Sequence, residues 1–112
     1  MDLEAILARL ETEQARLREE LAQGIEAPGQ MTYGSQAAAA SQVFAQQRDI
    51  ALHDRAQRQL DLVQAALARL DRGGYGACQR CGRPIDPARL EAIPWAAFCI
   101  DCQRTEGRRG SA

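Results

Sequence analysis

The chain has 112 residues, with 14 basic and 15 acidic side chains and a formal net charge of −1, and this length suits one small domain or two subdomains. No apolar run is long enough to span a bilayer, and the acidic N-terminus, Met1-Asp-Leu-Glu, differs from a signal peptide. These features exclude a membrane protein and predict a cytoplasmic one. The net charge near zero argues against the strongly basic surface that is typical of nucleic-acid-binding proteins.

The first predicted element is a helix over residues 3–23, where leucines recur at alternating steps of four and three. This spacing is typical of a coiled-coil seam. Asp2 and Glu4 place negative charge in the first turn, where it complements the helix dipole, and Gly24 follows where a helix commonly ends. The predicted seam residues are Leu3, Leu7, Leu10, Leu17 and Leu21.

A second, longer helix is predicted over residues 36–72, because neither proline nor glycine interrupts it and Gly73 and Gly74 follow it. The stretch 24–41, which contains proline and glycine, forms the connector and tip of an antiparallel hairpin. At 1.5 Å per residue the two helices would be roughly 30 Å and 55 Å long. We therefore expect the last turns of the second helix, around 60–70, to extend past the first helix and to pack on the C-terminal module.

All four cysteines lie in two C-x2-C pairs that are separated by 17 residues: Cys78, Cys81, Cys99 and Cys102. This spacing is typical of a zinc site with four thiolate ligands. Such a site has no open position for water, so the zinc would stabilise the fold without catalysing a reaction. Two disulfides would need an oxidising compartment, and a thiol redox site would need one pair beside a βαβ pattern. The sequence therefore predicts one structural zinc ion.

Several residues near the cysteines suit a small metal module. Gly82 follows the second cysteine, where a sharp turn favours positive φ. Arg80 and Arg83 either offset the negative charge of four thiolates or are solvated surface residues. Trp95 either fills the small core or is an exposed anchor for a partner. The predicted core residues beneath the metal are Ile85, Leu90, Ile93, Pro94, Trp95, Phe98 and Ile100.

Three sequence segments carry a specific pattern: Tyr75-Gly-Ala-Cys-Gln-Arg-Cys-Gly82, Arg89-Leu-Glu-Ala92 and Cys99-Ile-Asp-Cys-Gln103. Preceded by a predicted helical hairpin, this pattern resembles the zinc finger of the DksA/TraR family. The resemblance implies a bacterial transcription regulator that binds RNA polymerase directly and does not bind DNA. It also implies that the coiled coil enters the secondary channel of the polymerase toward the active centre, with the zinc module at the channel rim.

The resemblance places the family's acidic tip motif, Asp-x-x-Asp-x-Ala, on Ser35, Ala38 and Ala40. Both aspartates are missing and only the alanine matches. These three residues are the candidate partner-binding tip. Without carboxylates, the tip could act only by occupying space.

Two further features depart from the family pattern. The basic positions through which its best-known member contacts ppGpp fall on Leu62, Ile93 and Gln103, and only Arg55 is preserved, so the resemblance does not extend to ppGpp binding. Relatives continue a C-terminal helix that helps to hold the polymerase. Here we expect only a short tail, interrupted by glycine at 107–110.

The predicted fold is mainly α, with an antiparallel coiled-coil hairpin at 1–72 and a four-cysteine zinc module with a short C-terminal tail at 73–112. An enzyme is not expected, because the chain lacks a catalytic triad pattern, a phosphate loop and an open metal site. His53, the single histidine, is expected to be a surface residue of a helix and not a metal ligand. Two functions stay open. The first is a polymerase-binding regulator. The second is a DksA-like scaffold that binds another protein, or that binds DNA through the mildly basic zinc end, where residues 71–112 hold seven arginines against five acids.

Overall fold

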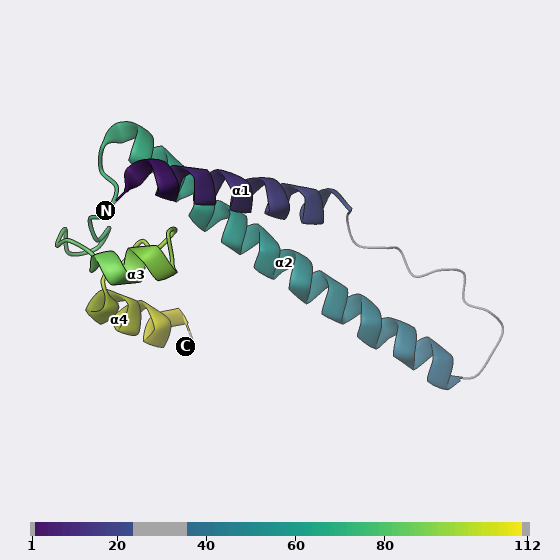
Figure 1. Cartoon of the computed structure of the whole chain (residues 1–112). Coiled ribbons are helices and arrows are strands. Elements are labelled where there is room, and N and C mark those ends of the chain that lie inside the picture. Colours follow the sequence, from purple (N-terminus) through teal and green to yellow (C-terminus); the bar gives the residue numbers. More distant parts are fainter. Residues whose placement is uncertain (1, 24–35, 111–112) are drawn as a thin grey trace.

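The protein is described by a computed structural model that covers residues 2–23 and 36–110. In these ranges the chain forms α1 (Leu3–Ala22), α2 (Gln36–Arg72), α3 (Pro87–Ala92) and α4 (Ile100–Gly110). Figure 1 shows α1 and α2 as an antiparallel hairpin, with α3 and α4 together on one side of it. The predicted fold class, a helical hairpin followed by a four-cysteine module, is confirmed. None of the described helices is long and apolar enough to cross a membrane.

The helix ends follow from local hydrogen bonding. The carboxylate of Asp2 accepts hydrogen bonds from the backbone N–H groups of Glu4 and Ala5, at 3.0 and 3.2 Å, and so caps α1. At the end of α2, Gly73 adopts a φ of 80°, a left-handed conformation that strains other residues. The predicted stop at Gly24 lies outside the described residues.

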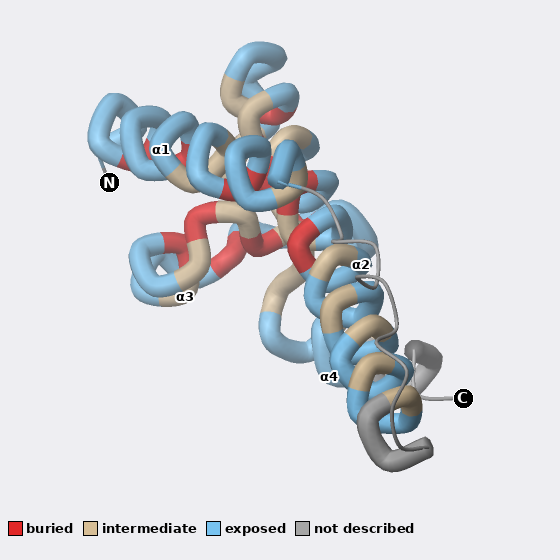
Figure 2. Tube along the Cα trace, turned by 90° about the vertical axis from the view of Figure 1, so that its right-hand side faces the viewer, coloured by how far each residue is buried: buried red, intermediate tan, exposed pale blue. Residues whose placement is uncertain are grey.

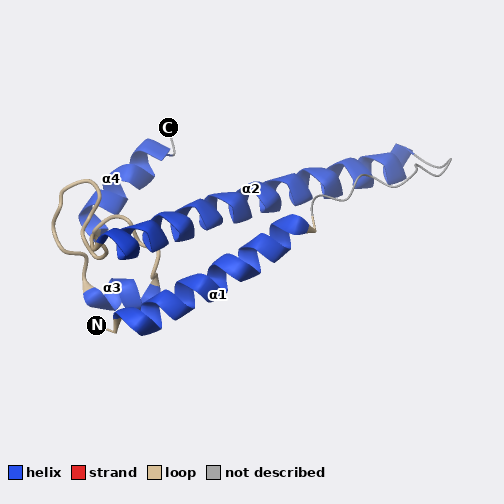
Figure 3. Ribbon diagram, turned by 90° about the horizontal axis from the view of Figure 1, so that it is seen from above, coloured by secondary structure: helices blue, strands red, loops and turns tan. Residues whose placement is uncertain are grey.

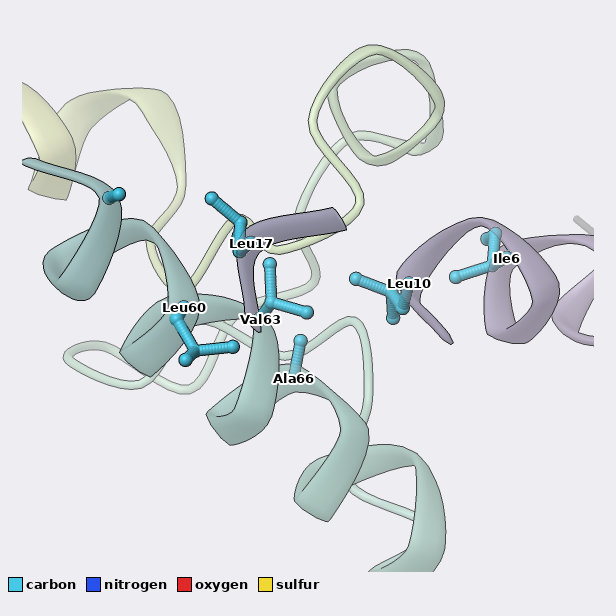
Figure 4. Packing of buried hydrophobic residues seen from close by; sticks show 7 residues of the cluster. Ile6, Leu10, Leu17, Leu60, Val63 and Ala66 are labelled. Carbon is cyan, nitrogen blue, oxygen red and sulfur yellow. The ribbon is translucent and has the colours of Figure 1, made fainter. Parts of the chain in front are cut away.

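The hairpin core is formed where α1 crosses the C-terminal half of α2. Its members are apolar residues that lose nearly all contact with solvent, and each buried leucine or valine contributes about 1.5–3 kcal/mol relative to an exposed one. Figure 4 shows most of them pointing into the space between the two helices. The core residues are Ile6, Leu10, Leu17, Ala56, Leu60, Val63 and Ala66.

The predicted seam of α1 is partly wrong, because Ile6 is buried while Leu3 and Leu7 are 50% and 40% exposed. Successive helical residues are rotated by about 100°, which places Ile6, Leu10 and Leu17 within about 40° of one another. This narrow stripe faces α2. Leu3 and Leu7 lie on the adjoining stripe, at the edge of the interface.

The part of α2 that extends past α1 is its N-terminal part, not its last turns. The end of α1 lies beside Asp49 and His53, since both line one surface depression together with Gln23. Residues 36–48 continue for roughly 20 Å beyond that point. This arrangement is visible in Figure 3. The expectation that 60–70 lies past α1 is therefore wrong, because those turns form the hairpin core.

The C-terminal module packs against the hairpin core. Trp95 and Tyr75 are half-buried and pack against the cluster between α1 and α2. Figure 2 shows the buried residues gathered where the hairpin and the segment around α3 meet. The sequence predicted Trp95 in the core beneath the metal. The structure instead places it between the module and the hairpin. Ile100, also expected in that core, is 48% exposed.

The C-terminal segment differs from the short tail that we expected. It continues as α4 to Gly110, although glycine lowers helix propensity. The helix begins inside the second cysteine pair, where Gln103 N–H donates a 2.8 Å hydrogen bond to the carbonyl of Cys99. Anchoring of its first turn at the metal site accounts for a helix that local propensity disfavours.

Candidate metal centre

The first cysteine pair lies in a tight turn between short antiparallel backbone segments. Ala77 and Pro84 form an isolated β-bridge, and Ile85 N–H donates a 2.7 Å bond to the carbonyl of Gly76. Gly82 has a φ of 77°, as its predicted place in a sharp turn requires. Its N–H donates to the carbonyl of Cys78 at 2.9 Å, which closes the turn.

The second cysteine pair is positioned by α3 and α4. Asp86 caps α3 by accepting a 3.0 Å hydrogen bond from Ala88 N–H, and Pro87 occupies the first helical position. The segment after α3 then returns to the first pair, because Gln79 N–H donates 2.8 Å to the carbonyl of Ala97. This backbone bond holds the two cysteine pairs side by side.

The four sulfur atoms converge on one point. All four Sγ atoms lie within 4.8 Å of one another, and the Sγ atoms of Cys81 and Cys99 are 3.8 Å apart. A disulfide would bring two sulfurs to about 2.05 Å, and all four cysteines are free thiols. In a tetrahedral site with Zn–S bonds of about 2.3 Å, neighbouring sulfurs lie about 3.8 Å apart. The donor set therefore fits one zinc ion.

The ionisation of the cysteines also fits a cation site. Burial opposes ionisation of Cys78, but backbone hydrogen bonds from Cys81 and Cys99 favour its thiolate, and its pKa falls to about 6. The pKa of Cys102 rises to about 12, because burial and the neighbouring thiols disfavour a further negative charge. Four thiolates this close can coexist only around a cation. The cluster thus favours a divalent metal ion.

A small apolar core lies beneath the cysteines. Cys78 itself is part of it, and Gly76, with a φ of 94°, brings the backbone to the side chain of Leu90. Ile93 and Phe98 pack against the same cluster. Most of the core that we predicted from the sequence is present, with Ala96 replacing Trp95. The buried members are Cys78, Ile85, Leu90 and Ala96.

The two arginines beside the cluster have different surroundings. Arg80 forms an ion pair with Glu106 of α4, with Nη1 and Oε1 3.3 Å apart. This pair ties the first cysteine turn to the C-terminal helix. Arg83 is exposed, as a solvated surface residue would be.

Two side-chain hydrogen bonds, from Arg9 and Arg69, connect the module to the hairpin, and a third, from Tyr75, lies within the module. The hydroxyl of Tyr75 donates 2.8 Å to the carbonyl of Pro94, and Arg69 donates 3.3 Å to the carbonyl of Ala96. Arg9 of α1 donates to the carbonyl of Glu91. These polar contacts are not predictable from the sequence, because the composition of a helix does not indicate which arginine faces a distant carbonyl. The start of α3, by contrast, is predictable from the sequence, because Asp86-Pro87 is a typical N-terminal capping pattern.

The other candidate residues that the structure describes are divided between α2 and the metal module. Ala40 is exposed in the first turns of α2, Ala38 also belongs to α2, and Ser35 lies outside the described residues. Of the positions aligned with the ppGpp contacts, Arg55 and Leu62 are exposed on α2. The remaining two, Ile93 and Gln103, belong to the metal module.

Comparisons with known proteins agree with this geometry. A family model described as the prokaryotic dksA/traR C4-type zinc finger matches residues 73–106. The RNA polymerase-binding transcription factor DksA of Caulobacter vibrioides is 36% identical over 61 residues, which are 54% of this chain and 43% of that protein. The aligned segment thus spans less than half the length of this curated relative.

Solved structures extend the similarity to the hairpin. The structure of transcription factor DksA2 from Pseudomonas aeruginosa is 32% identical, with 97% of this chain and 82% of that chain covered and a TM-score of 0.65. The DnaK suppressor protein from Agrobacterium tumefaciens is 27% identical, with 94% of each chain covered and a TM-score of 0.65. Together with four cysteines positioned to bind one metal ion, for which zinc is the expected ion, these matches establish that the chain belongs to the DksA/TraR family.

Proposed function

We propose that this protein binds bacterial RNA polymerase in the cytoplasm and regulates transcription without catalysing a reaction. The observation that carries the proposal is the similarity over almost the whole chain to a DksA2 transcription factor, hairpin and metal module included. The name of the Caulobacter relative, an RNA polymerase-binding transcription factor, supports the choice of partner. In this proposal the hairpin enters the secondary channel and the metal module stays at the rim.

The shape of α2 suits such an entry. Residues 36–48 extend past α1, and a single helix is only about 10–12 Å wide with its side chains. Val43 and Phe44 on this segment are 51% and 71% exposed. Apolar side chains at such exposure can contribute binding energy when a partner covers them. We propose that they contact the channel wall.

The role of the metal in this proposal is structural. We propose that Cys78, Cys81, Cys99 and Cys102 hold one zinc ion and leave no position for water, so the ion would supply cross-linking energy and no reaction chemistry. The pair of Arg80 and Glu106 holds α4 on the first cysteine turn, and the hydrogen bond from Arg69 to the Ala96 carbonyl joins the module to the hairpin. A fixed angle between hairpin and module would let both contact the polymerase at once.

The tip residues determine how the proposed regulator acts. Ser35, Ala38 and Ala40 carry no charge, so the tip cannot coordinate or repel the magnesium ion of the polymerase by electrostatics. Steric exclusion remains as its means of action. The absence of basic side chains at Leu62, Ile93 and Gln103 likewise supports regulation that does not depend on ppGpp.

The proposal is tested with the purified, zinc-loaded protein and the RNA polymerase of the same organism. A binding titration should give saturable binding, and in vitro transcription should change at sensitive promoters. Ala40→Trp should alter transcription while leaving polymerase affinity nearly unchanged, whereas Cys99→Ser should weaken binding itself. Aspartates introduced together at Ser35 and Ala38 should shift activity toward that of acidic-tip relatives. Binding to promoter DNA and not to polymerase would favour the DNA-binding alternative.

A further inference from the structure

The hairpin has two flanks, and the metal module covers one of them. Arg9 and Arg69 reach this module through hydrogen bonds to the carbonyls of Glu91 and Ala96. Because successive helical residues are rotated by about 100°, a residue two positions earlier projects about 200° away. Leu7 on α1 and Leu67 on α2 are those residues, so they mark the flank opposite the metal module, whose place on one side of the hairpin Figure 1 shows.

A groove of about 430 Å³ runs along this opposite flank, between the first turns of α1 and the last turns of α2. Its floor is formed by leucines of both helices, of which Leu3 and Leu7 are 50% and 40% exposed. Leu67 and Leu70 of α2 are half-buried, so the exposed apolar surface of the groove comes mainly from α1. Clustered exposed apolar side chains of this kind are a common feature of docking sites. The groove is lined by Leu3, Glu4, Leu7, Leu67, Leu70 and Asp71.

The charged residues that line the groove have one sign. Glu4 and Asp71 add carboxylates to its lining, and none of the residues that line it is basic. Asp71 lies in the last turn of α2, where a negative charge opposes the helix dipole and lowers helix stability. A carboxylate that is unfavourable for its own helix becomes useful when a cationic partner approaches it. The groove therefore complements an apolar segment with basic neighbours.

We propose that this groove docks an amphipathic helix of a partner protein, with leucine-like side chains on one face and arginine or lysine beside them. Two antiparallel helices leave a straight channel between them, into which a third helix packs by the usual ridges-into-grooves geometry. The groove lies at the end of the hairpin opposite to residues 36–48. Docking there goes beyond the polymerase proposal and does not depend on it.

The probe for a test is a fluorescein-labelled helical peptide of about 18 residues, with leucines at i, i+3, i+4 and i+7 and arginines flanking them. Binding to the zinc-loaded full chain is followed by fluorescence anisotropy. Leu7→Gln should weaken binding roughly tenfold or more, as expected for one leucine lost from an interface. Leu62→Gln is the matched control, because Leu62 is 41% exposed on α2 outside the groove, and it should leave binding unchanged.

Charge reversal provides a second measurement. The double variant Glu4→Arg, Asp71→Arg should lose the arginine peptide and gain affinity for a peptide with glutamates at the same places. Circular dichroism melting should show that each variant stays folded. Equal losses for Leu7→Gln and Leu62→Gln, no binding below about 1 mM, or no preference between the two peptides would overturn the proposal. So would self-association in sedimentation that Leu7→Gln abolishes, since a second copy would then occupy the groove.

Discussion

Arg69, which is 5% exposed near the end of α2, donates a hydrogen bond from Nη2 to the carbonyl oxygen of Ala96 in the metal module, at 3.3 Å. Burial lowers the pKa of this guanidinium, partly offset by the nearby Tyr75. Trp95, the neighbour of Ala96, packs against the hairpin core. The hairpin and the metal module are therefore joined by a continuous buried contact.

Replacing Arg69 tests the strength of this contact. Arg69→Met keeps much of the apolar stem but leaves the Ala96 carbonyl without its donor, and we expect a loss of about 1–3 kcal/mol in the free energy of unfolding. Arg72→Met is the matched control, because Arg72 is exposed in the same last turn. Urea denaturation of both variants measures the two losses. Equal denaturation midpoints for the two variants would contradict a stabilising contact between Arg69 and Ala96.

The position of the hairpin seam gives a second prediction. Ile6 is 4% exposed and packs in the core, so Ile6→Ala should cost about 2–5 kcal/mol. Leu3→Ala should change stability by no more than about 0.5 kcal/mol, because Leu3 is half exposed. Thermal unfolding followed by circular dichroism measures both. A larger loss for Leu3→Ala than for Ile6→Ala would instead support the seam that the leucine spacing predicts.

The seam illustrates what sequence periodicity can and cannot predict. Leucine spacing correctly indicated that α1 pairs with α2, since apolar residues recur at helical intervals. It could not choose between two adjoining stripes, because Leu10 and Leu17 belong to both and only the rotation of α1 on α2 favours Ile6 over Leu3. The segment of α2 that lies against α1 was also misjudged. Helix lengths alone do not give the register of a pair.

The metal centre was the most predictable part, because two C-x2-C pairs constrain geometry directly. The surrounding polar contacts were not predictable, since they join segments far apart in sequence, such as Arg9 and Glu91. The C-terminal helix escaped prediction for a related reason. Its glycines weaken it locally, while tertiary anchoring at Cys99 and the Arg80–Glu106 pair supports it.

Tyr75 gives a prediction about pH. Burial raises its pKa, against the opposing influence of Arg69 and Arg9, so the folded state holds the phenol proton more tightly than the unfolded state. The stability that the buried phenol contributes is complete below the pKa of tyrosine in the unfolded state, about 10. It is lost as the pH rises through the higher pKa of the folded state. Tyr75→Phe should remove this alkaline loss.

At pH 7 the same variant, Tyr75→Phe, should cost about 0.5–1.5 kcal/mol, because the 2.8 Å hydrogen bond to the Pro94 carbonyl is gone. Denaturation midpoints measured between pH 7 and 11 test both parts. An unchanged alkaline decline in the variant would show that the phenol is not its cause.

Metal removal gives a prediction about the two halves of the chain. All buried residues of the hairpin core come from α1 and α2, which hold 20 and 37 helical residues against 6 and 11 in α3 and α4. Chelation under reducing conditions should therefore leave most of the helical signal. Trp95 should become more exposed, and its fluorescence should shift to the red. Loss of all helical signal at 25 °C would mean that hairpin and module unfold as one unit.

Polymerase entry by the hairpin is the central claim, and photo-crosslinking tests it most directly. In one variant, benzoylphenylalanine replaces Phe44, which is 71% exposed on the part of α2 that extends past α1. In a second variant, it replaces Leu62, which lies on the part of α2 that forms the hairpin core. With the RNA polymerase of the same organism, we expect position 44 to crosslink to the secondary channel near the active centre and position 62 to crosslink farther out or not at all. Absence of crosslinks from position 44, or crosslinks confined to promoter DNA, would contradict the account.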